Sequence, residues 1–124
     1  MPDPAKMEAV VHAYIDGFGT GDADAIAALY AQDGTAEDPV GSPIHTGREA
    51  IRAFYAESMK TGAKLRLDGP VRVVADQAAF PFSVHLEFQG AAKRIDVIDT
   101  FRFNDANEIV EMRAFWGAAN AHDI

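Results

Sequence analysis

The segment DVIDTFRF, Asp96 to Phe103, alternates in a pattern that predicts a β-strand with one buried face. Successive side chains of a strand point to opposite faces, so Val97, Asp99, Phe101 and Phe103 share one face. That face is apolar except for Asp99. The segment is therefore predicted to line the core of a sheet, and a carboxyl group stands where Val, Ile or Phe is usual.

The same period of two extends over the second half of the chain. Leu65 and Leu67 begin it after Gly62, and a long alternating segment runs from Phe80 to Gln89. The stretches QGAAK and NDAN are typical of turns on either side of the Asp99 strand, and a last strand is predicted from residue 109 to about residue 117. These segments together predict an antiparallel meander.

The first half of the chain follows the helical period instead. Apolar residues recur at helical spacing from Met7 to Phe18, and Asp22 is placed to cap a second helix whose stripe includes Tyr30. Thr46 and Glu49 form the pattern of a capping box before a third helix, and TAEDPVGSP (35–43) predicts a short strand running into a loop. Helices followed by strands predict an α+β fold: a conical, curved antiparallel (mixed) sheet with three helices packed on one face.

Composition limits the classes of function. With 124 residues, the chain is predicted to form one domain over residues 1–124. The formal net charge of -8 argues against nucleic acid as a partner, and no apolar run approaches the roughly 20 residues that span a bilayer. The N-terminus also lacks the pattern of a secretory signal, so a cytoplasmic protein without membrane attachment is expected.

The chain has no cysteine, and its four histidines show no metal-ligand spacing. Disulfides and thiolate chemistry are therefore excluded, and a zinc site is not predicted. Any catalysis is expected to use oxygen and nitrogen groups.

Asp99 has two interpretations. If it is buried without a cation, its pKa rises, and the neutral acid can donate a hydrogen bond. Alternatively, the residue lies at a bulge, faces solvent, or pairs with Arg102 or Arg113. Buried unpaired carboxyls are rare, so the pattern by itself leaves both interpretations open.

Two further groups of residues could take part in chemistry. The three tyrosines, Tyr14, Tyr30 and Tyr55, fall within predicted apolar stripes and are either separate core residues or a chain of phenols that polarise one another. Asp38, before Pro39, is a candidate carboxylate at the edge of the cone or an Asx-turn residue. No sequence rule selects Asp38 as the candidate carboxylate over Glu37, Asp33 or Asp68.

Four segments together resemble the bacterial ketosteroid isomerases of the nuclear-transport-factor-like superfamily. They are YAQDGTAEDPVG (30–41), GREAIRAFYAESMK (47–60), AAFPFSVHLEFQG (78–90) and DVIDTFRF. The resemblance extends from near Met7 to about Asn120, almost without gaps.

The resemblance implies a role for each of the polar candidates. Asp38 matches the general base of that family, Tyr14 its principal oxyanion donor, and Asp99 a protonated acid that donates a second hydrogen bond. Tyr30 and Tyr55 match a supporting network, and Pro39 matches a proline whose cis peptide bond aims the base. The reaction implied is the movement of the double bond of a β,γ-unsaturated 3-ketosteroid into conjugation through a dienolate.

The resemblance also implies a homodimer that needs no metal or organic cofactor. A rigid steroid would lie against an apolar wall, for which the candidates are Phe54, Phe82, Val84, Leu86, Val97, Phe101, Met112 and Trp116. Leu86 stands where some relatives have an aromatic residue, which leaves the substrate fit open. A polyketide cyclase-like enzyme and a non-catalytic module that binds a sterol or another small ligand remain the alternatives, since one fold supports several functions.

Overall fold

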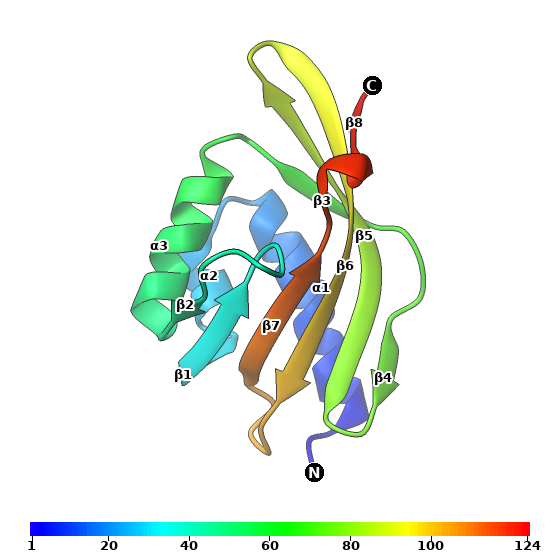
Figure 1. The fold of residues 1–124 in the computed structure, drawn as a ribbon. Coiled ribbons are helices and arrows are strands. Elements are labelled where there is room, and N and C mark those ends of the chain that lie inside the picture. Colours follow the sequence, from blue (N-terminus) through cyan, green and yellow to red (C-terminus); the bar gives the residue numbers. More distant parts are fainter.

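A computed structural model describes residues 1–124 as three helices and one eight-stranded sheet (Figure 1). The helices are α1 (Pro4–Gly19), α2 (Ala23–Ala27) and α3 (Arg48–Met59). The strands are β1 (Tyr30–Glu37), β2 (His45–Thr46), β3 (Lys64–Leu67), β4 (Arg72–Val74), β5 (Gln77–Phe88), β6 (Ala91–Phe103), β7 (Ile109–Phe115) and β8 (Ala121–Asp123). A short 3₁₀ turn, η1 (Ala118–Asn120), precedes β8.

The sheet is mixed and strongly curved. Its strand order is β2-β1-β7-β6-β5-β3, while β4 also pairs with β5 and β8 with β6. β1 runs parallel to β7 and the other pairs are antiparallel. The sheet bends around the helices, which lie on its concave side (Figure 1). The predicted α+β fold class is confirmed, and none of the helices combines the length and hydropathy that crossing a bilayer requires.

The second helix begins where the sequence indicates, whereas α1 begins at Pro4, before the predicted start at Met7, with Asp3 as its N-cap. The apolar stripe of α1 is buried, and Asp22 caps α2 by accepting a hydrogen bond from the backbone N–H of Ala25 at 3.0 Å. The prediction that Tyr30 ends the stripe of the second helix is wrong, because α2 stops at Ala27 and Tyr30 begins β1. Pairing explains the difference, since Tyr30 lies opposite Ile109 in the parallel ladder with β7.

The predicted capping box of α3 is not formed. The N-cap residue is Gly47, whose φ of 93° lies in the region that glycine tolerates best, and no side chain caps the helix. Thr46 instead pairs with Thr35 in the ladder between β1 and β2, so the sheet holds its backbone.

Pro81 has no backbone N–H, so β5 lacks one hydrogen-bond donor at this position. No neighbouring strand lies there to accept a hydrogen bond from it. β3 ends opposite Phe82 and β4 begins opposite Ala79, so Pro81 faces the gap between them. Its carbonyl accepts from Asp68 N–H in the connecting loop, at 2.9 Å. Pro81 therefore lies at a local edge within an otherwise continuous strand.

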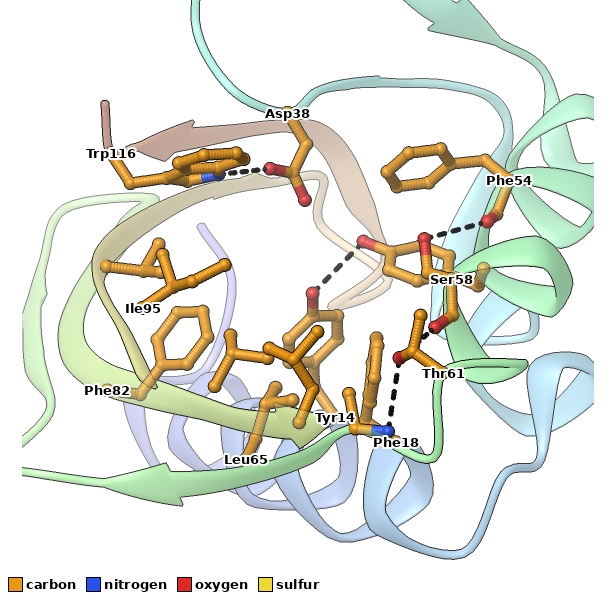
Figure 2. A pocket seen from close by; sticks show the side chains of 15 residues that line it. Tyr14, Phe18, Asp38, Phe54, Ser58, Thr61, Leu65, Phe82, Ile95 and Trp116 are labelled. Carbon is orange, nitrogen blue, oxygen red and sulfur yellow. Dashed lines mark hydrogen bonds between the residues drawn. The ribbon is translucent and has the colours of Figure 1, made fainter. Parts of the chain in front are cut away.

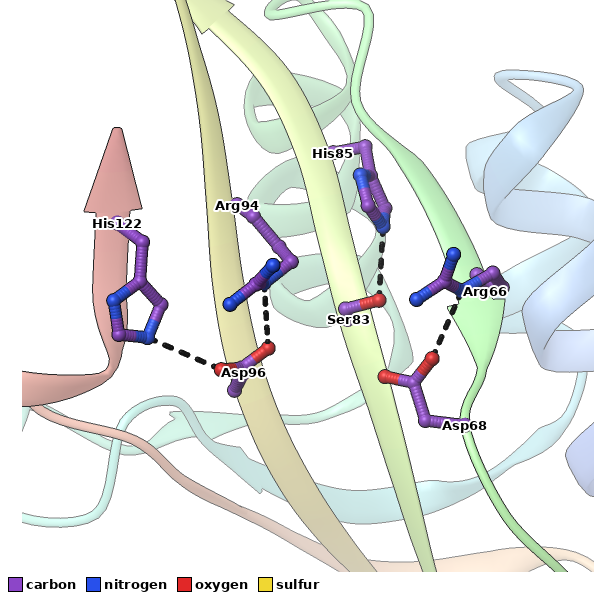
Figure 3. Close-up of polar contacts among 7 residues, drawn as sticks. All are labelled: Arg66, Asp68, Ser83, His85, Arg94, Asp96 and His122. Carbon is purple, nitrogen blue, oxygen red and sulfur yellow. Dashed lines mark hydrogen bonds and ion pairs between the residues drawn. The ribbon is translucent and has the colours of Figure 1, made fainter. Parts of the chain in front are cut away.

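The convex face of the sheet is partly polar (Figure 3). Ser83 Oγ and His85 Nε2 lie 2.9 Å apart, and Asp96 contacts both Arg94 and His122. On the same face, Ile98 and Phe115 are directly paired across β6 and β7, and both side chains are exposed. The concave face carries the core and, at its open end, a pocket.

Candidate active site

The pocket lies between the helices and the concave face of the sheet and has a volume of about 260 Å³. Fifteen residues line it: Tyr14, Phe18, Asp38, Phe54, Tyr55, Ser58, Thr61, Ala63, Leu65, Phe82, Val84, Leu86, Ile95, Val97 and Trp116 (Figure 2). Twelve of them are hydrophobic, so a bound molecule would be held mainly by apolar contact.

Six of the eight predicted wall residues line the pocket, and two do not. Phe101 and Met112 are fully buried in the core instead. The ring of Phe101 packs edge-on against that of Tyr14, with centroids 5.2 Å apart, so α1 covers it. Strand alternation correctly predicts that Phe101 and Met112 face the concave side of the sheet. It does not predict which part of that side is covered by other elements and which part is open as a pocket.

Asp38 lies at the pocket, in the turn that follows β1. Its Oδ1 accepts a hydrogen bond from Trp116 Nε1 at 2.8 Å (Figure 2). The Asp38–Pro39 peptide bond is cis. The backbone N–H of Val40 donates to the carbonyl of Ala114 at 2.8 Å, which ties the turn to β7. Burial raises the pKa of Asp38, while the hydrogen bond from Trp116 lowers it.

The other acidic candidates are engaged elsewhere. Glu37 accepts from the backbone of Gly41 and from Arg113, and these bonds lower its pKa. Asp68 is paired with Arg66 at 2.9 Å, and Asp33 is exposed on β1. None of the three lines the pocket. The structure thus selects Asp38 from the group that sequence reasoning left open.

The three tyrosines form a chain of hydroxyls beside the pocket, as one of the two interpretations predicts. Tyr55 Oη lies 2.7 Å from Tyr30 Oη and 3.2 Å from Tyr14 Oη, the Tyr14 hydroxyl being the donor. Burial is the main cause that raises the pKa of all three phenols well above its ordinary value. They therefore stay protonated and able to donate hydrogen bonds.

Asp99 is the buried carboxyl of the site. Its side chain is 1% exposed, and neither carboxyl oxygen has a hydrogen-bond partner. It lies opposite Phe80 and Ala114 in the neighbouring strands, so the alternatives of a solvent-facing residue or an arginine partner do not apply. Burial raises the pKa of Asp99 well above its usual range, and the charge of Asp38 raises it further.

Asp99 is close to the pocket without forming part of its surface. It follows Val97 on the same face of β6, and Val97 lines the pocket. Phe101 follows Asp99 on that face, and its ring packs against Tyr14 with centroids 5.2 Å apart. Tyr14 from α1 and Asp38 from the end of β1 thus line the cavity, and Asp99 lies on β6 behind its surface.

Sequence reasoning missed six lining residues: Phe18, Ser58, Thr61, Ala63, Leu65 and Ile95. A signal was available for Phe18 and Ser58, which belong to predicted helical stripes that also contain Tyr14 and Phe54. Thr61 and Ala63 lie in the connection after α3, where no periodic pattern indicates orientation.

The protonation of Asp99 has a measurable effect on stability. Its pKa in the folded protein is raised above the unfolded value near 3.9, so the folded state binds more protons between the two values and stability is lost as pH rises through that window. Asp99→Asn removes this loss. We expect the unfolding free energy of the variant, minus that of the unmodified protein, to grow with pH by up to about 1.4 kcal/mol per unit.

Denaturant unfolding at intervals between pH 4 and pH 9 measures this difference. The slope is the test, because any cost of burying the new amide is independent of pH. A difference that shrinks as pH rises would show that Asp99 is ionised and paired.

The Trp116 bond predicts a shift in pH dependence. Trp116→Phe keeps an aromatic ring but removes the N–H that stabilises the Asp38 carboxylate, so the pKa of Asp38 should rise. If Asp38 acts as a base, the acidic limb of kcat/KM against pH should move to higher pH. An unchanged limb would show that the bond does not influence the titrating group.

The fold and site define a class of protein: a cone-shaped α+β domain with an apolar pocket beside buried acid and phenol groups. The chain belongs to the SnoaL-like domain family, whose model matches residues 11–112. It is 42% identical over 113 residues to a protein named Steroid Delta-isomerase from Nocardioides simplex, a match that covers 90% of each chain.

A solved structure matches over the whole length of both chains. The epoxide hydrolase/cyclase-like enzyme SalBIII, described as acting in pyran ring formation in the polyether salinomycin, is 25% identical to this chain, with a TM-score of 0.92. These comparisons confirm the predicted family and fold.

Proposed function

We propose that the protein is a steroid delta-isomerase that moves the double bond of a β,γ-unsaturated 3-ketosteroid into conjugation with the ketone. The observation that carries the proposal is the buried, unpartnered Asp99, which lies next to Val97 on the face of β6 behind a pocket lined by Tyr14 and Asp38. The similarity to the Steroid Delta-isomerase of Nocardioides simplex supports the same activity.

Asp38 is the proton shuttle. Its carboxylate takes a proton from the carbon between ketone and alkene, and the electrons of that C–H bond form a dienolate with its charge on oxygen. Asp38 then returns the proton to the far end of the conjugated system. Its raised pKa suits both steps, because a base must also become an acid within one turnover.

Tyr14 and Asp99 bind the enolate oxygen. A neutral Asp99 has one O–H to donate and no protein acceptor for it, so it is free to meet a developing oxyanion. The Tyr14 proton, which points to Tyr55, can rotate about its C–O bond toward the oxyanion while Tyr55 donates to Tyr14 in turn. Donors aimed at developing charge stabilise the transition state more than the ground state.

The proposal is tested with a β,γ-unsaturated 3-ketosteroid by following the ultraviolet absorbance of the conjugated enone. Turnover that saturates with substrate is the expected result. A crystal structure with a planar phenolic steroid bound tests the oxyanion site, because the phenolate oxygen should lie within hydrogen-bond distance of Tyr14 and Asp99. An oxygen beyond the reach of either group would remove the basis of the mechanism.

A cyclase-like activity is the second candidate, favoured by the full-length match to SalBIII. The same Asp38 would then remove an acidic carbon-bound proton from a polyketide or protonate a leaving oxygen. Isomerase turnover decides in favour of the first candidate, whereas cyclisation of a polyketide without steroid turnover decides in favour of the second.

We also propose that the protein is a homodimer, as the family resemblance implies. The convex face supports this, because the paired side chains Ile98 and Phe115 are 51% and 43% exposed there, with Arg113 over the Phe115 ring at 5.3 Å. Sedimentation measures the mass in solution, and a monomer at all concentrations would contradict the proposal.

A further inference from the structure

A second hollow adjoins the pocket, on the part of the β5–β6 hairpin that projects beyond the helices (Figure 1). It has a volume of about 290 Å³, and residues 121–123 of β8 line one side of it. Leu86 and Ile95 line both cavities, so the two are neighbours. The proposed chemistry uses the pocket and gives this hollow no role.

Strand register places the two cavities on one continuous face of the sheet. Alternate residues of β5 share the concave side, and all of them from the core to the hairpin tip are apolar: Phe80, Phe82, Val84, Leu86 and Phe88. Phe80 is fully buried and lies opposite Asp99, Leu86 is half-buried, and Phe88 is 55% exposed. An apolar track thus leads from the buried carboxyl to the open end of the hairpin.

The order of groups along this track sets the direction of a bound ligand. The rings of Tyr14 and Phe80 have centroids 6.3 Å apart, so the phenol is at the buried end. At about 3.4 Å per residue, Leu86 lies roughly 20 Å and Phe88 roughly 27 Å from Phe80 along the strand. The pocket follows β5 from Phe82 to Leu86, and the hollow continues from Leu86 to Phe88. A rigid ligand bound at the phenol therefore directs its far end toward the hollow.

The hollow is suited to an apolar group without charge. Its apolar lining residues are Leu86, Phe88, Ile95 and Ala121. The charged side chains Lys93 and Asp123 pair with each other and present no unpaired charge to a ligand. His122 contacts Asp96 instead. An alkyl group placed here would cover part of the Phe88 ring that is now in contact with water.

We infer that the hollow holds an alkyl substituent of the substrate, so that the protein accepts 3-ketosteroids with a sterol-type side chain at carbon 17. This inference rests on the proposed function, because a ketone bound by Tyr14 and Asp99 sets the direction of the ring system. The four rings occupy the pocket, and the side chain passes over Leu86 into the hollow. Phe88 contributes to substrate specificity and takes no part in proton transfer.

The experiment compares two β,γ-unsaturated 3-ketosteroids, one with hydrogen at carbon 17 and one with the branched alkyl side chain of cholesterol. Both are supplied from the same cyclodextrin, and kcat/KM is measured by enone absorbance. We expect turnover of both. The deciding quantity is the ratio of kcat/KM for the alkylated steroid to that for the unsubstituted one, compared between variants, because differences in solubility then cancel.

Two variants alter the hollow at residues that do not line the pocket. Phe88→Ser removes an apolar wall, and Ala121→Phe fills the space with a ring. We expect each to lower the ratio by about 4- to 15-fold, the loss that follows when one or two methylene groups are no longer buried. Val74→Ser is the matched control and should leave the ratio unchanged, because Val74 is exposed on β4 and lines neither cavity.

An unchanged ratio in both Phe88→Ser and Ala121→Phe would overturn the inference. Turnover of the unsubstituted steroid without turnover of the alkylated one would do so too, as would an equally large change in Val74→Ser. Melting temperature checks folding. The two hollow variants are on different strands, so a stable one decides the question if the other does not fold.

Failure of the proposed function is distinguishable from failure of this inference. If neither steroid is turned over, the isomerase proposal falls, and the same pair of steroids is compared by binding. Trp116 is the single tryptophan and lines the pocket, so its fluorescence reports occupancy. A preference for the alkylated steroid that is reduced in Phe88→Ser and Ala121→Phe supports the subsite. Equal Kd ratios in all variants, or no binding of either steroid, overturn it.

Discussion

Replacing Asp38 with Asn is expected to lower turnover of a β,γ-unsaturated 3-ketosteroid by about 10²- to 10⁴-fold, the usual contribution of a placed proton-transfer group. The amide keeps the shape of the side chain and can still contact Trp116, but it cannot accept a proton from carbon. Steady-state kinetics by enone absorbance measures the loss. Binding of a planar phenolic steroid, followed by Trp116 fluorescence, should persist.

Two matched controls make the Asp38 result specific. Asp33→Asn removes an exposed carboxylate on β1. Asp68→Asn removes a carboxylate that pairs with Arg66. Both should retain full turnover, because neither side chain reaches the pocket. Equal loss of turnover and binding in Asp38→Asn would point to a structural role and favour a non-catalytic binding module.

Replacing Tyr14 with Phe is expected to lower kcat by about 10²- to 10³-fold. The ring and its contacts with Phe101 and Tyr55 remain, while the hydroxyl that would stabilise the oxyanion is lost. Because that bond strengthens as charge develops, the loss should appear in kcat more than in KM. A change confined to KM would show that Tyr14 binds the ground state alone.

Tyr30→Phe is the matched control for Tyr14. Tyr30 is at the far end of the phenol chain, separated from Tyr14 by Tyr55, and it does not line the pocket. In the proposed mechanism its hydroxyl would act on the oxyanion only by polarising Tyr55, an effect of about 10–30% per bond. Turnover should therefore fall by less than tenfold. A loss as large as that of Tyr14→Phe would mean that the chain acts as one unit.

Helical and strand periodicity are local consequences of backbone geometry, which explains why the order of helices and strands could be predicted well. The errors concern Tyr30 and Thr46, which local rules assign to a helix and its cap. Tyr30 pairs with Ile109 of β7, which is distant in the sequence, and Thr46 pairs with Thr35 of β1 across a loop. These partners hold both backbones in the sheet. Tertiary pairing overrides propensity there.

For the site, the sequence by itself determined that Asp99 shares a strand face with Val97 and Phe101 if the strand is regular, because alternation sets the face of a side chain. The sequence leaves open whether a bulge or solvent interrupts that face. The helical stripe likewise determined that Tyr14 points inward. Neither pattern distinguishes a pocket wall from the core behind it. Tertiary packing placed Phe101 against Tyr14 of α1 and left Met112 fully buried.

The tertiary structure alone decided which carboxylate faces the pocket and whether Asp99 has a partner. Glu37 and Asp38 are neighbours in the sequence, yet one binds Arg113 while the other meets Trp116 at the cavity. Arg102 is close to Asp99 in the chain, but it pairs with Glu111. Arg113 lies in the adjacent strand, but it pairs with Glu37. A pKa depends on burial and on charges within a few ångströms, and these are set by contacts between strands and helices that no local pattern encodes.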